Sequence, residues 1–388
     1  MPDPYPLLLR PIILEKIWGG RRLESLGKEL PKPRAKYGES WELADMGATS
    51  ASGAGGGAIR SIIANGELRG KTLHDAMAAW GDAMLGLRGT GVPPVGADHT
   101  PEAIQAKTPG QDAHATPGLE SRGTQDFPLL IKFLDASENL SVQTHPSPVY
   151  AAANPGANLK TECWYIIDAD PGALIYKGIR PAITRDAFAA LARAGDPKLV
   201  DAMVALPAIP GECHNLPSGT VHALGAGVLV AEVQTPSDTT YRVYDWGRTG
   251  RAMHIEQTLQ CATFSGEAGY KELLRCSTVG KLAPGQTQAR LVTTDFFTVD
   301  ELRPATGAVV PLGAIDATRG AGGPACLAIV VIDGECELVA DATAFQPVAL
   351  KRGDTALIPA AIAPQALLAA GSNLRVLLSS IQSVARAS

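Results

Sequence analysis

Short apolar runs separated by polar turns recur along the whole chain, and residues 127–146, FPLLIKFLDASENLSVQTHP, show the pattern most clearly. Residues 127–133 form an apolar run of strand length, and residues 135–139 supply turn-forming side chains. Residues 140–144 then alternate until Pro146 interrupts the pattern. The segment therefore predicts two strands joined by a polar turn.

The same periodicity predicts further strands in both halves of the chain. They are expected at residues 5–18, 38–46, 163–169, 173–179, 227–248 and 326–339. The segment 227–248 contains a polar corner at 236–239, and Asp333-Gly334 forms a favoured hairpin turn within the last segment. Many short strands, with 41 glycines and 29 prolines for turns, predict a mainly β fold.

Helical periodicity is confined to a few alanine-rich segments. Residues 61–66 suggest a short helix, residues 73–85 an amphipathic one with Thr72 as N-cap, and residues 254–261 another. Residues 183–206 are predicted to form two helices, the first capped by Thr184 and ended by Gly195. We expect this pair to form a small helical lobe.

Four side chains could hold one metal ion. Gln143 and His145 are two apart on a predicted strand, so they point to the same face. Glu162 follows on the next apolar strand and His222 on a later one. Two histidines, one carboxylate and one amide suit zinc or a neighbouring divalent transition metal, with room left for water or substrate.

The segment leading to His222 is the most specific motif in the chain. Gly211, five residues, Pro217-Ser218-Gly219, two residues and His222 match the second motif of cupin proteins. The first cupin motif matches less well, because Gln143 replaces a histidine and Glu162 lies farther along than usual. The extra spacing predicts an inserted loop at residues 150–160.

A second copy of the cupin pattern occurs near the end of the chain. Gly353 and Pro359 repeat the spacing, but Ala361 and Pro364 replace the glycine and the histidine. The pattern predicts two tandem cupin (jelly-roll) barrels, with the metal site in the first barrel only. The expected domains are residues 1–265, catalytic, and residues 266–388, metal-free.

Composition narrows the functional classes. The formal net charge is −5 and no basic stripe is present, which argues against a nucleic-acid partner. No apolar run is long enough to cross a bilayer, and six scattered cysteines without a Cys-x-x-Cys pair indicate reduced thiols. We therefore expect a cytoplasmic protein that does not bind membranes.

The segment 88–126 is rich in Gly, Pro, Thr and Ala and predicts a mobile surface loop.

Seven segments occur in this order along the chain: KIWGG, GESWE, LSVQTHP, KTECWY, PSGTVHALG, AEVQTPSDTTYRVYDWGR and MHIEQTL. Together they resemble type I mannose-6-phosphate isomerase in its short bacterial form. The resemblance implies interconversion of mannose 6-phosphate and fructose 6-phosphate with one zinc ion per chain. It also implies that Gln143, His145, Glu162 and His222 hold the zinc and that Arg242 is the active-site arginine. We expect a monomer or weak homodimer acting on a small sugar phosphate.

This isomerisation needs a general base and groups that bind the substrate's charges. Glu232 is the favoured base because burial makes a carboxylate more basic, and Lys160, on the same strand face as Glu162, could move the proton between O1 and O2. Lys132 and Ser141 are the candidates for phosphate binding.

Other interpretations stay open at this point. Glu232 could pair with Arg242 across the polar corner, and Lys132 could reach the rim of the barrel without binding any ligand. A metal oxygenase of the cupin class is disfavoured because Gln143 replaces a histidine. The remaining alternative is a metal cupin that acts on or senses another sugar phosphate without this turnover.

Overall fold

The computed structural model describes residues 2–49, 56–86, 126–154, 156–317, 324–340 and 344–381. The fold is mainly β, as the sequence predicted, and most strands belong to four antiparallel sheets, which we name sheets I to IV. Except for Asp126, the predicted loop at 88–126 lies outside the described residues. None of the helices in these ranges is both long and apolar enough to cross a membrane.

Sheets I and II carry the candidate metal ligands. Sheet I has the order β11-β10-β13-β8-β15, with bounds Met203–Pro207, Leu174–Ile179, His222–Leu224, Val142–Thr144 and Tyr241–Tyr244. Sheet II has the order β16-β12-β9-β14-β7-β3-β2, with bounds Val279–Lys281, Glu212–Leu216, Glu162–Ala169, Val228–Gln234, Leu130–Ala136, Tyr37–Leu43 and Ile12–Gly20. A buried cluster that includes Trp164, Leu134 and Val230 from sheet II and Ile175 and Leu224 from sheet I joins the two. The two sheets therefore face each other.

Sheets III and IV form the second pair. Sheet III has the order β17-β18-β25-β20-β23-β1-β6, with bounds Gln288–Thr293, Phe297–Leu302, Arg375–Ile381, Leu327–Asp333, Thr355–Ile358, Leu7–Arg10 and Ile62–Ile63. Sheet IV has the order β19-β24-β21-β22, with bounds Val309–Pro311, Ala366–Ala370, Glu335–Ala340 and Val348–Lys351. Alternate residues of β20, such as Ile329 and Val331, pack against Leu338 and Leu368 of sheet IV.

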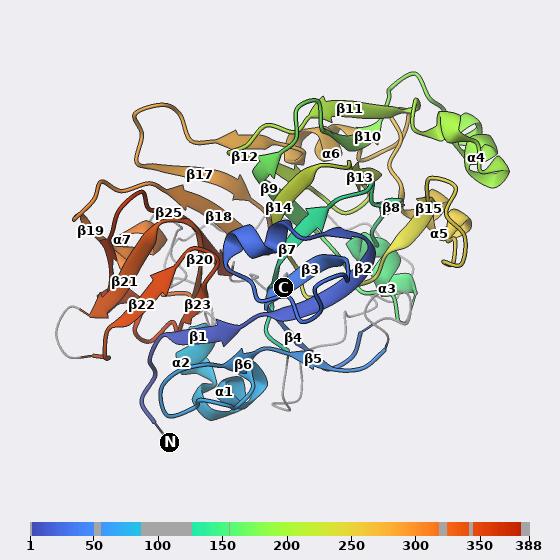
Figure 1. Cartoon of the computed structure of the whole chain (residues 1–388). Helices are drawn as coiled ribbons and strands as arrows, with labels where there is room; N and C mark the ends of the chain where they lie inside the picture. The colour runs from blue at the N-terminus through green and yellow to red at the C-terminus, as the bar shows by residue number, and fades with distance from the viewer. Residues whose placement is uncertain are drawn as a thin grey trace, which may run out of the picture.

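Sheets II and III pack against each other through their other faces. Ile131 and Phe133 of β7 share a core with Ala328 and Val330 of β20. Lys132, between the two β7 residues, points to the opposite face of sheet II because side chains alternate along a strand. The layers therefore follow the order I, II, III, IV, and Figure 1 places the blue strands β2 and β3 between the red C-terminal strands and the green and yellow middle of the chain.

Two strands cross the predicted division at residue 265. Strand β1 pairs with β23, although their residues lie at opposite ends of the chain. Strand β16 pairs with β12 of sheet II, although it belongs to the predicted second domain. The division into residues 1–265 and 266–388 stays a prediction, and these pairings bind its two parts together.

Two predicted N-caps are present, but the single helix predicted at residues 73–85 is divided in two at Gly81. The α-helices α1 to α7 have the bounds Leu73–Trp80, Asp82–Leu85, Pro148–Ala153, Arg185–Ala194, Ile255–Cys261, Tyr270–Cys276 and Leu312–Ala317. The 3₁₀ helices η1 to η3 have the bounds Arg22–Leu26, Pro197–Leu199 and Ala363–Gln365. Thr72 and Thr184 cap α1 and α4 as predicted, each accepting a backbone N–H.

Three local predictions were wrong. Residues 61–66 contain strand β6, which pairs with β1, and not a helix. The helical lobe at 183–206 is helical only up to η2, because Met203–Pro207 pairs with β10 as strand β11. The predicted loop at 150–160 begins inside α3, which Ser147 caps and Pro148 starts. Two short strands, β4 (Asp45–Met46) and β5 (Ile59–Arg60), complete the fold.

Candidate active site

One row of side chains crosses the face of sheet I that is turned toward sheet II. Lys177, His222, Gln143 and Arg242 lie directly opposite one another on β10, β13, β8 and β15. Directly opposed residues in antiparallel strands point to the same face. Sheet pairing therefore places Arg242 on one side of Gln143 and His222 on the other, and Gln143 and His222 are both metal ligands predicted from the sequence.

A matching row crosses sheet II. Trp164, Glu232, Lys132 and Trp41 lie directly opposite one another on β9, β14, β7 and β3. Glu162 is two residues before Trp164, so it points to the same face. The two rows enclose the site between the sheets.

Three predicted metal ligands meet in this space. Glu162 Oε1 lies 3.2 Å from His222 Nε2, and Glu162 Oε2 lies 3.5 Å from His145 Nε2. Their ligand atoms all lie within 4.8 Å of one another, and all three residues are buried. Gln143 lies beside them, with Nε2 3.4 Å from His222 Nε2. The structure thus brings together the four residues named from the sequence.

Backbone carbonyls orient both imidazoles. His145 Nδ1 is 2.9 Å from the carbonyl oxygen of Thr239, and His222 Nδ1 is 3.0 Å from that of Thr220. A carbonyl oxygen only accepts hydrogen bonds, so this contact assigns the ring proton to Nδ1 and leaves a lone pair on Nε2. Orienting a histidine ligand through its other nitrogen is a common feature of metal sites.

The donor atoms fit a divalent cation. His145 Nε2 and Glu162 Oε1 are buried and have no hydrogen-bond partner, whereas Glu162 Oε2 faces the Lys160 ammonium at 2.7 Å. The lone pairs of the two imidazole nitrogens and the negative charge of the Glu162 carboxylate repel one another at 3.2–3.5 Å unless a cation lies between them. Imidazole nitrogens, a carboxylate and an amide oxygen form a set that zinc accepts. An exchange of O and N in the Gln143 amide turns its oxygen toward His222.

The charges of the site keep the ligands in their metal-binding forms. Burial and the nearby Lys160 ammonium together lower the pKa of His145 to about 3, although Glu162 opposes them, so the imidazole is neutral near pH 7. Burial raises the pKa of Glu162, but Lys160 and His145 outweigh it and hold that pKa well below the usual range. Lys160 Nζ is 2.7 Å from Glu162 Oε2, and this pair, together with Glu232, raises the pKa of Lys160 despite its burial.

Glu232, the predicted base, lies next to the metal-ligand cluster. Its Oε1 is 3.4 Å from Lys132 Nζ and 3.9 Å from Lys160 Nζ. No ion pair links Glu232 to Arg242, both of which the structure describes, so the alternative pairing across the corner was wrong. Arg242 is buried instead, with Nη1 donating to the Ala252 carbonyl and Nε without a hydrogen-bond partner.

The two predicted phosphate-binding residues are already engaged inside the site. Lys132 is 5% exposed, and its Nζ lies 4.6 Å from the Trp41 ring centroid, so it does not reach the rim. Ser141 donates a hydrogen bond to Gln143 Oε1. Their role toward phosphate stays a prediction.

The sequence analysis missed several polar neighbours of the site. Trp164 Nε1 donates to Glu232 Oε2, and Trp41 Nε1 donates to Glu39 Oε2. Burial raises the pKa of Glu39, but Lys16 and Lys132 dominate and lower it to about 2. The alternation of polar and aromatic residues at 160, 162 and 164 placed Trp164 on the ligand face, but no sequence signal indicated the partner of its N–H.

A second group of potential metal ligands lies outside this site, and the guanidinium of Arg60 contacts it. Asp45, His74 and Asp126 gather near β4 and α1. Arg60 Nε is 3.2 Å from Asp45 Oδ1, and His74 Nδ1 is 3.2 Å from Asp45 Oδ2. Because Arg60 balances the buried Asp45 carboxylate, this group does not need a metal ion.

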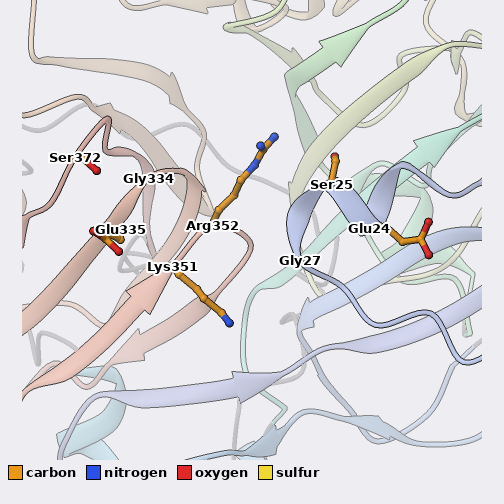
Figure 2. Close-up of a pocket in the computed structure, with 8 residues that line it drawn as sticks. All are labelled: Glu24, Ser25, Gly27, Gly334, Glu335, Lys351, Arg352 and Ser372. Atoms are coloured by element: carbon orange, nitrogen blue, oxygen red, sulfur yellow. The ribbon is translucent and has the colours of Figure 1, made fainter.

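A surface pocket between η1 and strands β21 and β22 is separate from the site. It has a volume of about 560 Å³ and is lined by Glu24, Ser25, Gly27, Gly334, Glu335, Lys351, Arg352 and Ser372. Figure 2 shows the Lys351 and Arg352 side chains pointing apart, so their charges do not converge on one ligand. None of these residues belongs to the cluster between sheets I and II.

Comparisons with known proteins identify relatives of this chain. No family model matches the chain. The probable mannose-6-phosphate isomerase GmuF of Bacillus subtilis is 35% identical over 269 residues, 67% of this chain and 69% of the relative. The mannose-6-phosphate isomerase of Streptococcus mutans is 32% identical over 301 residues, 76% of this chain and 77% of the relative.

Solved structures extend the similarity to nearly the whole chain. The crystal structure of mannose 6-phosphate isomerase from Bacillus subtilis aligns with a TM-score of 0.69 and 27% identity, covering 96% of this chain and 99% of that one. A zinc-bound mannose 6-phosphate isomerase shares the fold, with a TM-score of 0.63 and 17% identity over 97% and 99% of the chains. On the identity and coverage of the curated relatives, this chain belongs to the mannose-6-phosphate isomerase family.

Proposed function

We propose that the chain interconverts D-mannose 6-phosphate and D-fructose 6-phosphate with one zinc ion held by Gln143, His145, Glu162 and His222. One observation carries the proposal. The ligand atoms of His145, Glu162 and His222 lie within 4.8 Å of one another in a buried cluster, and Glu232 and Lys160 lie next to it. The zinc-bound relative of the same fold supports the choice of metal. We propose further that the two sheet pairs are tandem cupin barrels, with metal only in the first.

The ion, when bound, supplies a Lewis acid for the sugar oxygens. The rest of the reaction uses this chain's own groups. Glu232 removes the proton from C2 of the open-chain aldose, and the C2–H electron pair forms the C1–C2 double bond of a cis-enediolate. Glu232 then returns the proton to C1, which completes the ketose.

Two cationic side chains serve the oxygens during this transfer. The Lys160 ammonium gives a proton to O1 and receives the proton of the O2 hydroxyl, so no net proton leaves the site. Arg242 stabilises the negative charge of the enediolate from the facing sheet. Because Lys160 lies 2.7 Å from Glu162 and 3.9 Å from Glu232, it stands between the metal ligands and the base.

We also propose that the protein is a cytoplasmic monomer or weak homodimer. In the part of the chain that the structure describes, no disulfide joins Cys163, Cys213, Cys261, Cys276 and Cys336, which suits a reducing compartment.

The test is conversion of mannose 6-phosphate in deuterated water, followed by NMR. We expect fructose 6-phosphate to form and deuterium from the solvent to enter at C1, because the base exchanges its proton with solvent. Formation of no ketose by folded, zinc-loaded protein would refute the proposed turnover and favour a binding or sensing role.

A further inference from the structure

Trp164 joins the predicted base to a predicted metal ligand. It lies on β9, two residues after Glu162, and is 1% exposed. Its indole contacts Glu232 on the neighbouring strand of sheet II and His222 on the facing sheet I. No other described residue makes a hydrogen bond, ion pair or ring contact with both groups.

The first contact sets the orientation of the Glu232 carboxylate. Trp164 Nε1 donates a hydrogen bond of 2.9 Å to Oε2, while Oε1 faces Lys132 and Lys160 at 3.4 and 3.9 Å. An indole N–H is a donor only and its ring cannot rotate in a packed core, so Oε2 stays committed to it. Oε1 is therefore the oxygen left to take a proton from a substrate.

The second contact limits the tilt of the His222 ring. The two ring centroids are 5.3 Å apart and their planes are inclined at 82°, an edge-to-face arrangement. The Thr220 carbonyl holds His222 Nδ1 from the other side. These two contacts aim Nε2 at Glu162 before any metal arrives.

We propose that Trp164 is a positioning residue that holds the base oxygen Glu232 Oε1 and the ligand nitrogen His222 Nε2 in a fixed relative geometry. The inference deepens the proposed isomerase function and rests on it. A misplacement of the base by a fraction of an ångström lowers the rate of proton transfer without weakening substrate binding.

Trp164→Phe tests the first contact, because it removes the N–H and keeps an aromatic ring. We expect kcat to fall about 10- to 100-fold with KM unchanged. In a Glu232→Gln background the same substitution should have almost no further effect, because the group it acts through is already gone. Trp80→Phe is the matched control: its Nε1 also donates a hydrogen bond, in this case to the Pro2 carbonyl, and it lies outside the site.

Trp164→Leu tests the second contact without measuring turnover. Zinc titration of the metal-free protein by calorimetry should show affinity about 10-fold weaker than wild type for Trp164→Leu and near wild type for Trp164→Phe. Circular dichroism first establishes that each variant is folded at the temperature used.

Three results would overturn the inference. The first is an unchanged kcat in Trp164→Phe. The second is a fall in kcat on adding Trp164→Phe to Glu232→Gln that equals the fall in the wild-type background. The third is wild-type zinc affinity in Trp164→Leu. An inactive wild type would instead refute the proposed function, and the zinc titrations would still decide whether Trp164 orients His222.

Discussion

At the scale of single residues, Lys160 lies where the predicted metal ligands meet the predicted base. Its ammonium lies between the carboxylates of Glu162 and Glu232 and is almost fully buried. Lys160→Met removes the only proposed proton carrier between O1 and O2 and leaves the four predicted zinc ligands in place. We expect kcat to fall at least about 100-fold, with bound zinc retained.

Lys177→Met provides a matched control for this loss. Lys177 is also a buried lysine on the row of His222, but its Nζ donates to the Thr278 carbonyl. The control should keep kcat within about threefold of wild type. Steady-state kinetics and metal analysis of both variants measure kcat and bound zinc. A kcat near the wild-type value in Lys160→Met would mean that Lys160 has no role in the mechanism.

His214 should make the fold sensitive to acid. Burial lowers the pKa of this imidazole to about 4, and neither ring nitrogen has a hydrogen-bond partner. Between about pH 6.5 and 4 the unfolded chain binds a proton at this position that the folded chain does not, so stability falls as pH decreases. The loss is at most about 1.4 kcal/mol per pH unit for one proton.

Urea denaturation of wild type and His214→Leu at pH 7 and pH 5 measures this effect. Other titrating groups cancel in the difference between the two proteins. The variant should lose less stability than wild type on acidification, and equal losses would show that His214 is not the responsible group.

The sequence predicted which residues gather at the site better than it predicted their partners. Gln143, His145, Glu162 and His222 meet because strand alternation and one turn motif determine their faces, and both signals are local. The ring of contacts around Glu232 was not predictable in this way. Whether a carboxylate meets Arg242, Lys132 or an indole N–H depends on rotamers and on the facing sheet, which periodicity does not describe.

At the scale of secondary-structure elements, the cap of α1 is the clearest local device. Thr72 Oγ1 accepts from the Asp75 N–H, and the Asp75 side chain accepts from the Thr72 N–H, forming a capping box. Thr72→Ala removes one half of this arrangement. We expect a loss of about 1 kcal/mol in the free energy of unfolding, less for Thr72→Ser, and no change in kcat.

Chemical denaturation of the three proteins checks this prediction. An unchanged midpoint in Thr72→Ala would mean that packing of α1, and not its cap, sets the local stability.

Helices and strands were predictable from the sequence where the residues that determine their ends lie in or next to the element itself. Thr184 and Gly195 mark both ends of α4, and the structure agrees. The next segment reads as helix by composition, yet Met203–Pro207 forms β11 because β10 offers it a pairing edge. Tertiary pairing overrides a weak local preference in such short segments.

At the scale of the whole molecule, a buried ion pair links the first sheet pair to the second. Lys28 Nζ is 2.6 Å from Glu42 Oε2 and donates to the Gly353 carbonyl at 2.6 Å. Lys28→Met leaves the Glu42 carboxylate buried without its cation. We expect a loss of about 3–5 kcal/mol in stability.

The double variant Lys28→Met, Glu42→Leu tests the cause of that loss. It should recover a large part of the stability, because the uncompensated charge is gone. Thermal unfolding of both variants gives the comparison, and a double variant less stable than the single one would mean that Glu42 contributes through other contacts.

The large-scale arrangement was only partly accessible from sequence. Repetition of the turn pattern at 353–359 predicted a second β unit in the region where sheets III and IV lie. The pairing of β1 with β23 was not predictable, because Leu7–Arg10 has the same alternation as any strand and carries no information about its partner. Closing so long a loop depends on the packed core between sheets II and III.

We propose that the buried cluster of His145, Glu162 and His222 holds a zinc ion that isomerisation requires. The most direct test is the rate of fructose 6-phosphate formation from mannose 6-phosphate by one preparation as purified, after chelation, and after zinc is added back, with zinc per chain measured at each stage. Activity should disappear with the metal and return as zinc approaches one per chain. Full activity in the stripped protein would contradict the proposal.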